Sequence, residues 1–435
     1  MIKRERYLKE LIEAKGNGFP KVITGIRRCG KSYLLKEIYR SYLLEHDVEA
    51  SEILNVELDD IVNAKYRNPF ELTEYVKKWA AVSSKMHYVF IDEIQLVSPV
   101  INPSFTDGKI IIAKPTDPNV ITFVDVVLGL SRIANVDLYV TGSNAKLLSK
   151  DIVTEFRDKA TNIHLAPLTF KEFYDFVGGD RHDAFNEYLV YGGMPLAVLK
   201  GEAEQKENYL KGLFETTYLK DVLERNKIRK TESLGEIVDV LAYASGTLLN
   251  TQRIANMLES RKKEKINRKT VDFYLDAFED AYLIREAPRL DIKGNASIGA
   301  TRKYYFADNG LRNARLDFTS LDVGQMVENA VYNELKANGY RVEIGTFSQV
   351  EKDKNGKSVL KNYEIDFYAT KGVKTFYIQV TDNRNQESTK TRELAPYRLI
   401  RDANAKYVLV NQKLPMQKLE NGVLLQDVVD FLLSL

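Results

Sequence analysis

The stretch that decides the fold of the N-terminal part is Gly25-Ile26-Arg27-Arg28-Cys29-Gly30-Lys31-Ser32, a G-x-x-x-x-G-K-S pattern. The apolar, β-branched run 22–24 precedes it, and residues 33–42 follow it with apolar side chains at helical spacing. This order predicts a strand, a loop and a helix, the setting in which such a pattern binds phosphate. Glycines at both ends of the loop allow the backbone to approach the phosphates closely. The stretch therefore predicts a nucleoside triphosphate site.

Each residue type in the loop has an expected role. Lys31 would reach the β- and γ-phosphates, and the Ser32 hydroxyl would bind Mg²⁺, so ATP and Mg²⁺ are the predicted cofactors. Cys29, the only cysteine of the chain, is expected beside the phosphates. The predicted nucleotide-binding residues are Gly25, Arg27, Arg28, Cys29, Gly30, Lys31, Ser32 and Tyr33.

A second informative stretch is the apolar run 87–91, which leads directly into Asp92 and Glu93. The run is typical of a central parallel strand, and acids at its carboxyl end lie where ligands of open α/β sheets bind. We expect Asp92 to hold Mg²⁺ through water. Glu93 would polarise the attacking water, which makes it a predicted catalytic residue.

Two further catalytic residues are predicted downstream. The strand 137–141 ends at Ser143 and Asn144, and Asn144 is the predicted sensor of the γ-phosphate, with Ser143 as the alternative. Arg157 could complete the charge clamp on the transferred phosphoryl group, in its own subunit or in a neighbouring one. A solvated surface arginine is the alternative interpretation of Arg157.

Length and composition limit the class of protein. The chain has 435 residues, enough for several domains, and a formal net charge of +2, which gives no overall nucleic-acid signature. A single cysteine excludes an intrachain disulfide and a Cys-rich zinc site. The charged N-terminus and the lack of a long apolar run predict a cytoplasmic protein that does not enter a membrane.

The order of these signals resembles the AAA-type P-loop ATPases. The motifs are also similar to a bacterial and archaeal group of predicted ATPases whose C-terminal domain, of unknown function, resembles restriction endonucleases. Those motifs are Thr24–Ser32, Phe90–Gln95, Thr141–Asn144 and Pro167–Phe173. The resemblance implies an α/β fold with an AAA-type core, a helical lid, a winged helix-turn-helix and a nuclease-like α/β domain. The predicted domains are 1–167, with an inserted hairpin at 98–123, then 168–229, 230–312 and 313–435.

A local basic stripe lies in the predicted winged helix. Between Arg253 and Lys269 the sequence holds seven basic residues and two acids, which favours contact with a phosphate backbone. The predicted DNA-binding residues are Arg253, Arg261, Lys262, Lys263, Arg268 and Lys269. The alternative is a winged helix that makes oligomer contacts. Phe273, Tyr274 and Phe278 are expected in the core, because their spacing is helical.

In the C-terminal part the sequence predicts helices over 323–338 and 390–401 and strands over 341–346, 363–369, 375–381 and 405–411. This order resembles a nuclease fold in which acids hold Mg²⁺ beside a phosphodiester. The predicted nuclease-like site is Glu328, Asp366 and Gln379. Gln379 stands where a second carboxylate is usual, and Thr381 stands where a lysine is usual. A degenerate binding or assembly domain is therefore the leading interpretation, ahead of an active nuclease.

For the whole chain we expect an ATP-hydrolysing, ring-forming homo-oligomer that couples its nucleotide state to DNA binding or remodelling. Two alternatives stay open: a nucleotide-regulated DNA-binding switch with little turnover, and an ATP-gated nuclease.

Overall fold

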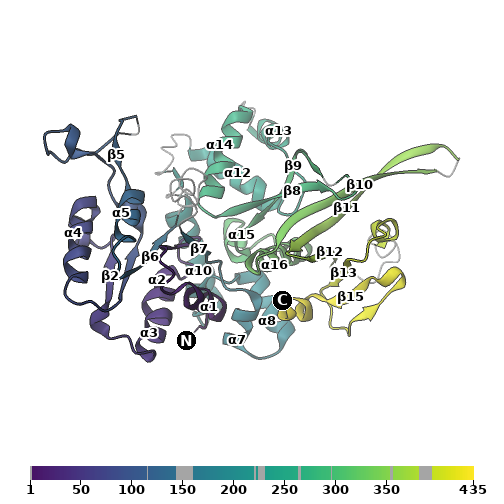
Figure 1. The fold of residues 1–435 in the computed structure, drawn as a ribbon. Helices are drawn as coiled ribbons and strands as arrows, with labels where there is room; N and C mark the ends of the chain where they lie inside the picture. Colours follow the sequence, from purple (N-terminus) through teal and green to yellow (C-terminus); the bar gives the residue numbers. More distant parts are fainter. Residues whose placement is uncertain are drawn as a thin grey trace. The chain divides into compact units, whose positions relative to one another are not determined.

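The computed structural model describes residues 2–114, 116–143, 160–219, 222–223, 231–262, 266–294, 296–352, 356–381 and 394–435. The chain forms two compact units, Met1–Leu165 and Ala166–Leu435 (Figure 1). The boundary between them lies close to residue 167, the predicted end of the ATPase core. The finer division into four domains stays a prediction.

The first unit is built on a five-stranded parallel sheet with the order β2-β3-β6-β1-β7. The strands are β1 (Lys21–Thr24), β2 (Ile53–Glu57), β3 (His87–Asp92), β6 (Val136–Gly142) and β7 (Thr161–His164). Every residue of β3 is buried, as its continuous apolar run predicts. Since β6 lies between β1 and β3, the carboxyl ends of all three strands meet at one edge of the sheet.

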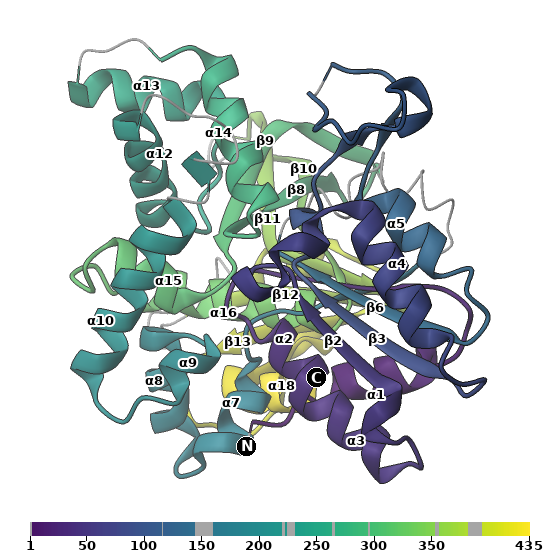
Figure 2. The ribbon, with the colours of Figure 1, turned by 90° about the vertical axis from the view of Figure 1, so that its left-hand side faces the viewer.

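Helices cover both faces of this sheet. The helix after the loop runs through α2 (Lys31–Tyr33), a π-type segment (Leu34–Tyr39) and α3 (Arg40–Glu45). Together with α1 (Glu5–Ala14) it covers one face, and α4 (Pro69–Ala80) and α5 (Phe123–Leu130) cover the other (Figure 2). The segment between β3 and α5 contains β4 (Val100–Ile101) and β5 (Val120–Ile121), which pair antiparallel within the range 98–123 predicted to be an insertion.

A buried polar network joins the loop strand to the sheet. Lys21 of β1 forms an ion pair with Asp137 of β6. The hydroxyl of Tyr139 donates to Asp137 Oδ2 at 2.7 Å and lies 2.6 Å from the hydroxyl of Tyr39. Because burying a lone charge is costly, the pair and its tyrosines fix β1 against β6 and against the helix that follows the loop.

Most helices of the second unit precede its strands in the sequence. Its helices include α7 (Phe170–Val177), α8 (Arg181–Tyr191), α9 (Pro195–Val198), α10 (Ala203–Leu213), α12 (Thr231–Tyr243), α13 (Thr251–Lys262), α14 (Arg268–Asp280) and α15 (Asn309–Arg315). Gly192 ends α8 with φ 70°, and a side chain there would come within 2.1 Å of the Asp308 carboxylate. That carboxylate accepts the Gly193 N–H at 2.6 Å, so the break between helices is fixed from a distant segment.

The sheet of the second unit has eight strands in the order β14-β15-β13-β12-β11-β10-β8-β9. Their bounds are β8 (Ile284–Asp291), β9 (Ala296–Phe306), β10 (Arg341–Lys352), β11 (Ser358–Lys371), β12 (Lys374–Thr381), β13 (Ala405–Val410), β14 (Gln417–Lys418) and β15 (Leu424–Asp427). Helices α16 (Val323–Ala337) and α18 (Val428–Ser434) belong to the same part of the unit. The hairpin β8–β9, expected to be the wing of the 230–312 segment, thus continues the C-terminal sheet.

Two details of this unit differ from the sequence-based expectation. Strands β14 and β15 and helix α18 were not predicted. A helix was expected over 390–401, but the described part of that range, 394–401, has only a short 3-10 helix at Pro396–Leu399. No helix among the described residues combines the length and the apolar character needed to cross a membrane.

Candidate nucleotide-binding site

The loop between β1 and α2 has the backbone that its glycines require. Gly25 has φ 146° and Gly30 has φ 101°, and Arg28 between them also has a positive φ of 64°. A side chain at Gly25 would lie 2.1 Å from the Leu165 carbonyl oxygen, so this position accepts only glycine. Successive residues of opposite backbone hand point their N–H groups into a concave surface that attracts anions.

Lys31 is folded back onto this loop. Its Nζ donates to the carbonyl oxygen of Gly25 at 3.0 Å and to that of Ile26 at 3.2 Å. The residue is 5% exposed. A buried ammonium bonded to neutral carbonyls is a cation that an incoming phosphate can draw away.

Asp92 connects the loop to the neighbouring strands. Its Oδ2 accepts a hydrogen bond from the Ser32 hydroxyl at 2.5 Å, and its Oδ1 accepts one from the Thr141 hydroxyl at the end of β6. The Lys36 ammonium lies 3.6 Å from the same Oδ2 and 2.7 Å from Glu57 Oε1. The two residues predicted to bind Mg²⁺, Ser32 and Asp92, are thus in direct contact.

Glu93 has a left-handed backbone conformation, with φ 54° and ψ 50°. This conformation is costly for a residue with a side chain and has to be held by its surroundings. The Glu93 N–H donates to Thr141 Oγ1 at 3.1 Å, and its Oε2 accepts from Ser143 at 3.1 Å and from Gln95. Two side chains therefore orient the predicted catalytic carboxylate, and Thr141 holds the backbone of the same residue.

Sequence reasoning missed Thr141 and the acids at the end of β2. The parallel register pairs Val140 with Ile91, so Thr141 comes level with Asp92, a relation that only the strand pairing reveals. The carboxylates of Glu57, Asp59 and Asp92 lie within 4.8 Å of one another, the only such metal-sized group among the described residues. Glu57 is the last residue of β2 and Asp59 follows it by two positions, so acids at a strand end were the signal available in the sequence.

The other predicted nucleotide-binding residues have different environments. Arg28 is exposed and Tyr33 is 40% exposed, where partial burial and then the Glu37 charge raise its pKa. Cys29 is 1% exposed, and its thiol lies 3.4 Å from the Leu165 carbonyl oxygen, to which it donates. The thiol therefore packs against the residue that follows β7, and its place beside the phosphates stays a prediction. Asn144 and Arg157 lie outside the described residues.

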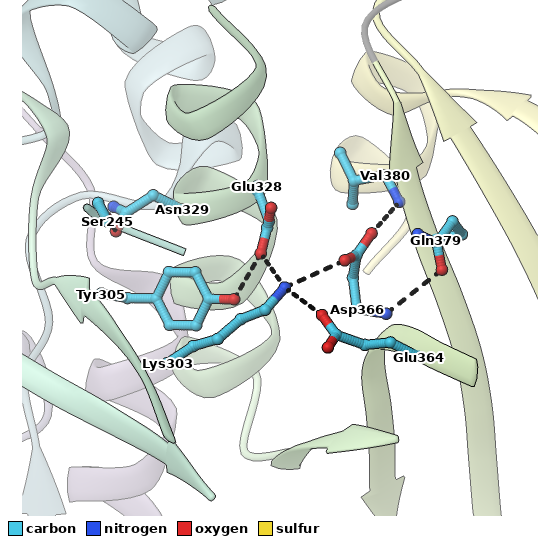
Figure 3. Close-up of polar contacts among 9 residues, drawn as sticks. All are labelled: Ser245, Lys303, Tyr305, Glu328, Asn329, Glu364, Asp366, Gln379 and Val380. Carbon is cyan, nitrogen blue, oxygen red and sulfur yellow. Dashed lines mark hydrogen bonds and ion pairs between the residues drawn. The ribbon is translucent and has the colours of Figure 1, made fainter. Parts of the chain in front are cut away.

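The residues of the predicted nuclease-like site meet in the second unit around a lysine that the sequence did not reveal (Figure 3). The Lys303 ammonium of β9 lies 2.9 Å from Glu328 of α16 and 3.2 Å from Asp366 of β11. It also lies 3.1 Å from Glu364 of β11. Gln379 is adjacent, and its amide oxygen accepts the Asp366 N–H at 3.4 Å.

The basic stripe is described in part. Arg253 on α13 and Lys269 on α14 are exposed, and the Arg268 Nε donates to Thr251 at 3.0 Å. Arg261 and Lys262 lie on α13, but their side chains are not among those described, and Lys263 lies outside the described residues. Tyr274 and Phe278 are core residues as expected, whereas Phe273 is 45% exposed and its core prediction is wrong.

Comparison with known proteins places the chain in a family. Residues 17–174 match the AAA domain, and residues 182–322 match a domain of unknown function. An uncharacterized protein of Haemophilus influenzae is 31% identical over 439 residues, which cover 100% of this chain and 99% of that protein. An uncharacterized protein of Methanocaldococcus jannaschii is 28% identical over 393 residues, covering 87% of this chain and 77% of that protein.

Solved structures are more distant. A Walker-type ATPase of Pyrococcus abyssi is 15% identical, with a TM-score of 0.47 over 73% of this chain and 96% of that one. The ORC1 protein of Aeropyrum pernix, solved in complex with DNA, is 12% identical, with a TM-score of 0.28 over 72% and 92% of the two chains. By sequence, the chain belongs to the family of the uncharacterized Haemophilus influenzae protein, and its N-terminal unit is a nucleotide-binding AAA domain with a P-loop.

Proposed function

We propose that the chain hydrolyses ATP with Mg²⁺ at the loop 25–32. The observation that carries the proposal is the arrangement of Asp92 and Glu93. Asp92 is bonded to the loop serine on one side and to Thr141 on the other, and Thr141 also accepts the Glu93 N–H. One threonine therefore bonds the Asp92 carboxylate, which would hold the metal, and the backbone of Glu93, whose carboxylate would act on the water.

The residues present fit both cofactors. A serine hydroxyl and a carboxylate are hard oxygen ligands of the kind that Mg²⁺ prefers. The loop offers left-handed residues at Arg28 and Gly30, whose backbone suits an anion, and the N-terminus of the following helix attracts negative charge. Mg²⁺, when bound, would neutralise charge on the terminal phosphates.

The side chains suggest how each would act. Lys31 would leave the carbonyls of Gly25 and Ile26 for the phosphate oxygens, where a charge-assisted bond is stronger. Glu93 would orient a water for attack on the γ-phosphate and accept its proton. Ser143 and Gln95 both bond the same oxygen of Glu93 and so would hold the carboxylate in its orientation.

Glu93→Gln is the test of this proposal. The amide keeps the shape of the side chain but accepts no proton, so ATP turnover should fall by on the order of 100-fold. The dissociation constant for ATP should stay within a few-fold, because Glu93 would contact the water and not the loop. Phosphate release and equilibrium nucleotide binding measure the two quantities.

The matched control is Glu45→Gln, an exposed acid at the end of α3. It should leave both quantities unchanged. Wild-type turnover no faster than that of Glu93→Gln would contradict the proposal and favour a nucleotide-regulated switch with little turnover.

We further propose that the cycle is coupled to DNA through the segment 231–306. Its order of three helices and a hairpin, α12 to β9, supports a winged helix. Leu249 exchanges both backbone hydrogen bonds with Arg302 of β9, at 2.8 Å each, which adds a short strand to the hairpin. Exposed Arg253 and Lys269 supply positive charge near the start of α14.

The rest of α14 limits where DNA would lie. Asp272, Asp276, Glu279 and Asp280 follow along this helix, and burial together with Asp276 raises the pKa of Glu279 to about 7. Acids repel phosphate, so we place the backbone contact at the first turn of α14 and at α13, not along the whole of α14.

Salt-dependent binding tests the DNA contact. Arg253→Ala and Lys269→Ala should each lower the slope of log K against log salt by about 1, since each removes one phosphate contact. Lys418→Ala, on an exposed position of β14, is the control and should keep the slope. Equal slopes in all three variants would instead favour a winged helix used for oligomer contacts. A homo-oligomeric ring, in which Arg157 reaches a neighbour's γ-phosphate, is the assembly that this function would use.

A further inference from the structure

We propose that the Lys303 ammonium is the resident cation of the carboxylate cluster formed by Glu328, Glu364 and Asp366. It takes the place that a divalent metal would need for phosphodiester cleavage. The C-terminal sheet would therefore keep the residues of a nuclease-like site without its metal chemistry. This inference concerns the second unit and does not depend on ATP hydrolysis in the first.

The position of the ammonium is the first argument. Lys303 Nζ contacts Glu328 Oε1 at 2.9 Å, Glu364 Oε1 at 3.1 Å and Asp366 Oδ1 at 3.2 Å, and its side chain is 5% exposed (Figure 3). An ammonium has three hydrogen-bond donors, and three carboxylates are its partners here. Two of its donors bond Glu328 and Asp366, and the Glu364 carboxylate forms an ion pair with the same nitrogen, so the ammonium is surrounded by acids of the chain itself.

The size of the cluster is the second argument. Its oxygens surround the nitrogen at 2.9 to 3.2 Å, whereas Mg²⁺ binds oxygen at about 2.0–2.1 Å. Each carboxylate would have to move inward by about 1 Å to hold that ion. In the described part of the chain, carboxylates spaced for a metal are found at Glu57, Asp59 and Asp92 and not here.

The other groups of the cluster hold the carboxylates in place. The Tyr305 hydroxyl donates to Glu328 Oε1 at 2.6 Å, so that oxygen is shared with the lysine. The Val380 N–H donates to Asp366 Oδ2 at 2.9 Å, and the Gln379 amide oxygen accepts the Asp366 N–H. Gln379, which stands where a second carboxylate is usual, is thus directed to the backbone.

Charge supports the same conclusion. Three carboxylates would leave a strongly negative buried site, and the lysine offsets one charge of it. Burial raises the pKa of Glu328 to about 7, although the neighbouring ammonium acts in the opposite direction. The lysine pKa is raised by Glu328, Asp366 and Glu364 despite its burial, so it stays charged. Removing Lys303 would leave an uncompensated site that attracts a divalent cation.

Mn²⁺ binding to the nucleotide-free full chain tests the proposal. The variants are Lys303→Met, which keeps the length of the side chain without its charge, Asp366→Asn, and the double variant. Wild type and Asp366→Asn should bind the same number of Mn²⁺ ions. Lys303→Met should bind one more, and the double variant should lose that ion. Electron paramagnetic resonance of free Mn²⁺ counts the ions.

Two results would overturn the proposal. One is a Mn²⁺ ion in wild type that Asp366→Asn abolishes, or plasmid cleavage by wild type that Asp366→Asn abolishes, since either shows a working metal site. The other is a folded Lys303→Met protein that gains no ion. Thermal unfolding establishes whether that variant folds. If Lys303→Met does not fold, the comparison of wild type with Asp366→Asn still tests whether the native cluster binds a metal ion.

Discussion

Lys31 in the first unit and Lys303 in the second are both buried lysines, and they differ in their partners. Lys31 bonds two neutral carbonyls of its own loop, at 3.0 and 3.2 Å. Lys303 contacts three carboxylates from a helix and a strand distant in sequence. A phosphate can outcompete carbonyls for an ammonium, but it offers little advantage over three carboxylates already in place.

The comparison shows that a lysine beside acids is not by itself a sign of phosphate chemistry. What matters is whether the cation can exchange its partners. In the first unit Asp92 bonds the hydroxyls of Ser32 and Thr141 and lies beside the Lys36 ammonium, so Lys31 is not the cation that balances it. In the second unit the lysine itself balances the acids. The bonds of Lys31 suit a residue that exchanges partners during ATP turnover, whereas those of Lys303 suit a residue that keeps its partners.

The largest expected effect is a difference in ATP turnover between variants of the two lysines. Lys31→Ala should lower ATP turnover by on the order of 100-fold or more, because the charge that stabilises the transferred phosphoryl group is lost. Lys303→Met should leave turnover per folded molecule within about two-fold, because its partners lie in the other unit. Steady-state phosphate release measures both. A comparable loss of turnover in the two variants would contradict the claim that the two lysines have different roles.

A smaller effect is expected on stability as pH rises. The pKa of Glu328 is about 7 in the folded protein and is ordinarily 4.5. Between these values the folded state holds a proton that the unfolded chain has released, so the free energy of unfolding falls as pH rises from about 4.5 to about 7. We expect wild type to lose about 2 kcal/mol more than Glu328→Gln over this range.

Urea unfolding at pH 5 and pH 7.5, followed by circular dichroism, measures this difference. Burial also raises the pKa of Asp308, to about 6. Its effect on the free energy of unfolding is the same in wild type and in Glu328→Gln, so it cancels in the difference between them. The fluorescence of Trp79, the only tryptophan, reports the first unit and should not distinguish the variants. An equal fall in wild type and Glu328→Gln would show that the Glu328 carboxylate is ionised throughout.

The smallest expected effect concerns Cys29. Its thiol is buried against the Leu165 carbonyl, so Cys29→Ala should change the dissociation constant for ATP by no more than about two-fold. Alkylation of the native protein should be slow for the same reason and should accelerate in denaturant. Rapid alkylation with loss of nucleotide binding would place the thiol on the phosphate side of the loop after all.

Most residues of the candidate nucleotide site could be predicted from short stretches of sequence. The glycines, Lys31 and Ser32 are neighbours along the chain, and Asp92 and Glu93 end a strand that its apolar run identifies. Thr141 could not be assigned, because its role depends on the register of β6 against β3. The contact of Cys29 with Leu165 could not be assigned either, because a pattern does not tell on which side of the loop a side chain lies.

The second site depended on contacts that no local pattern contains. The acid positions follow from the resemblance to a nuclease fold, but Lys303 lies in a hairpin assigned to another predicted domain. It joins the cluster only because β8 pairs with β10 and extends the C-terminal sheet. Phe273 was misplaced for a related reason, since helical spacing alone does not separate the buried edge of a helix from the exposed one.

The pairing of β9 with the C-terminal sheet also decides where the protein can be cut. A fragment that begins at residue 313, as the predicted boundary suggests, would keep Glu328, Glu364 and Asp366 but lose Lys303 and Tyr305. Recombinant work on the C-terminal sheet should therefore include all of β8 and start no later than Ile284. Otherwise, any metal that the fragment binds would reflect the cut and not the native protein.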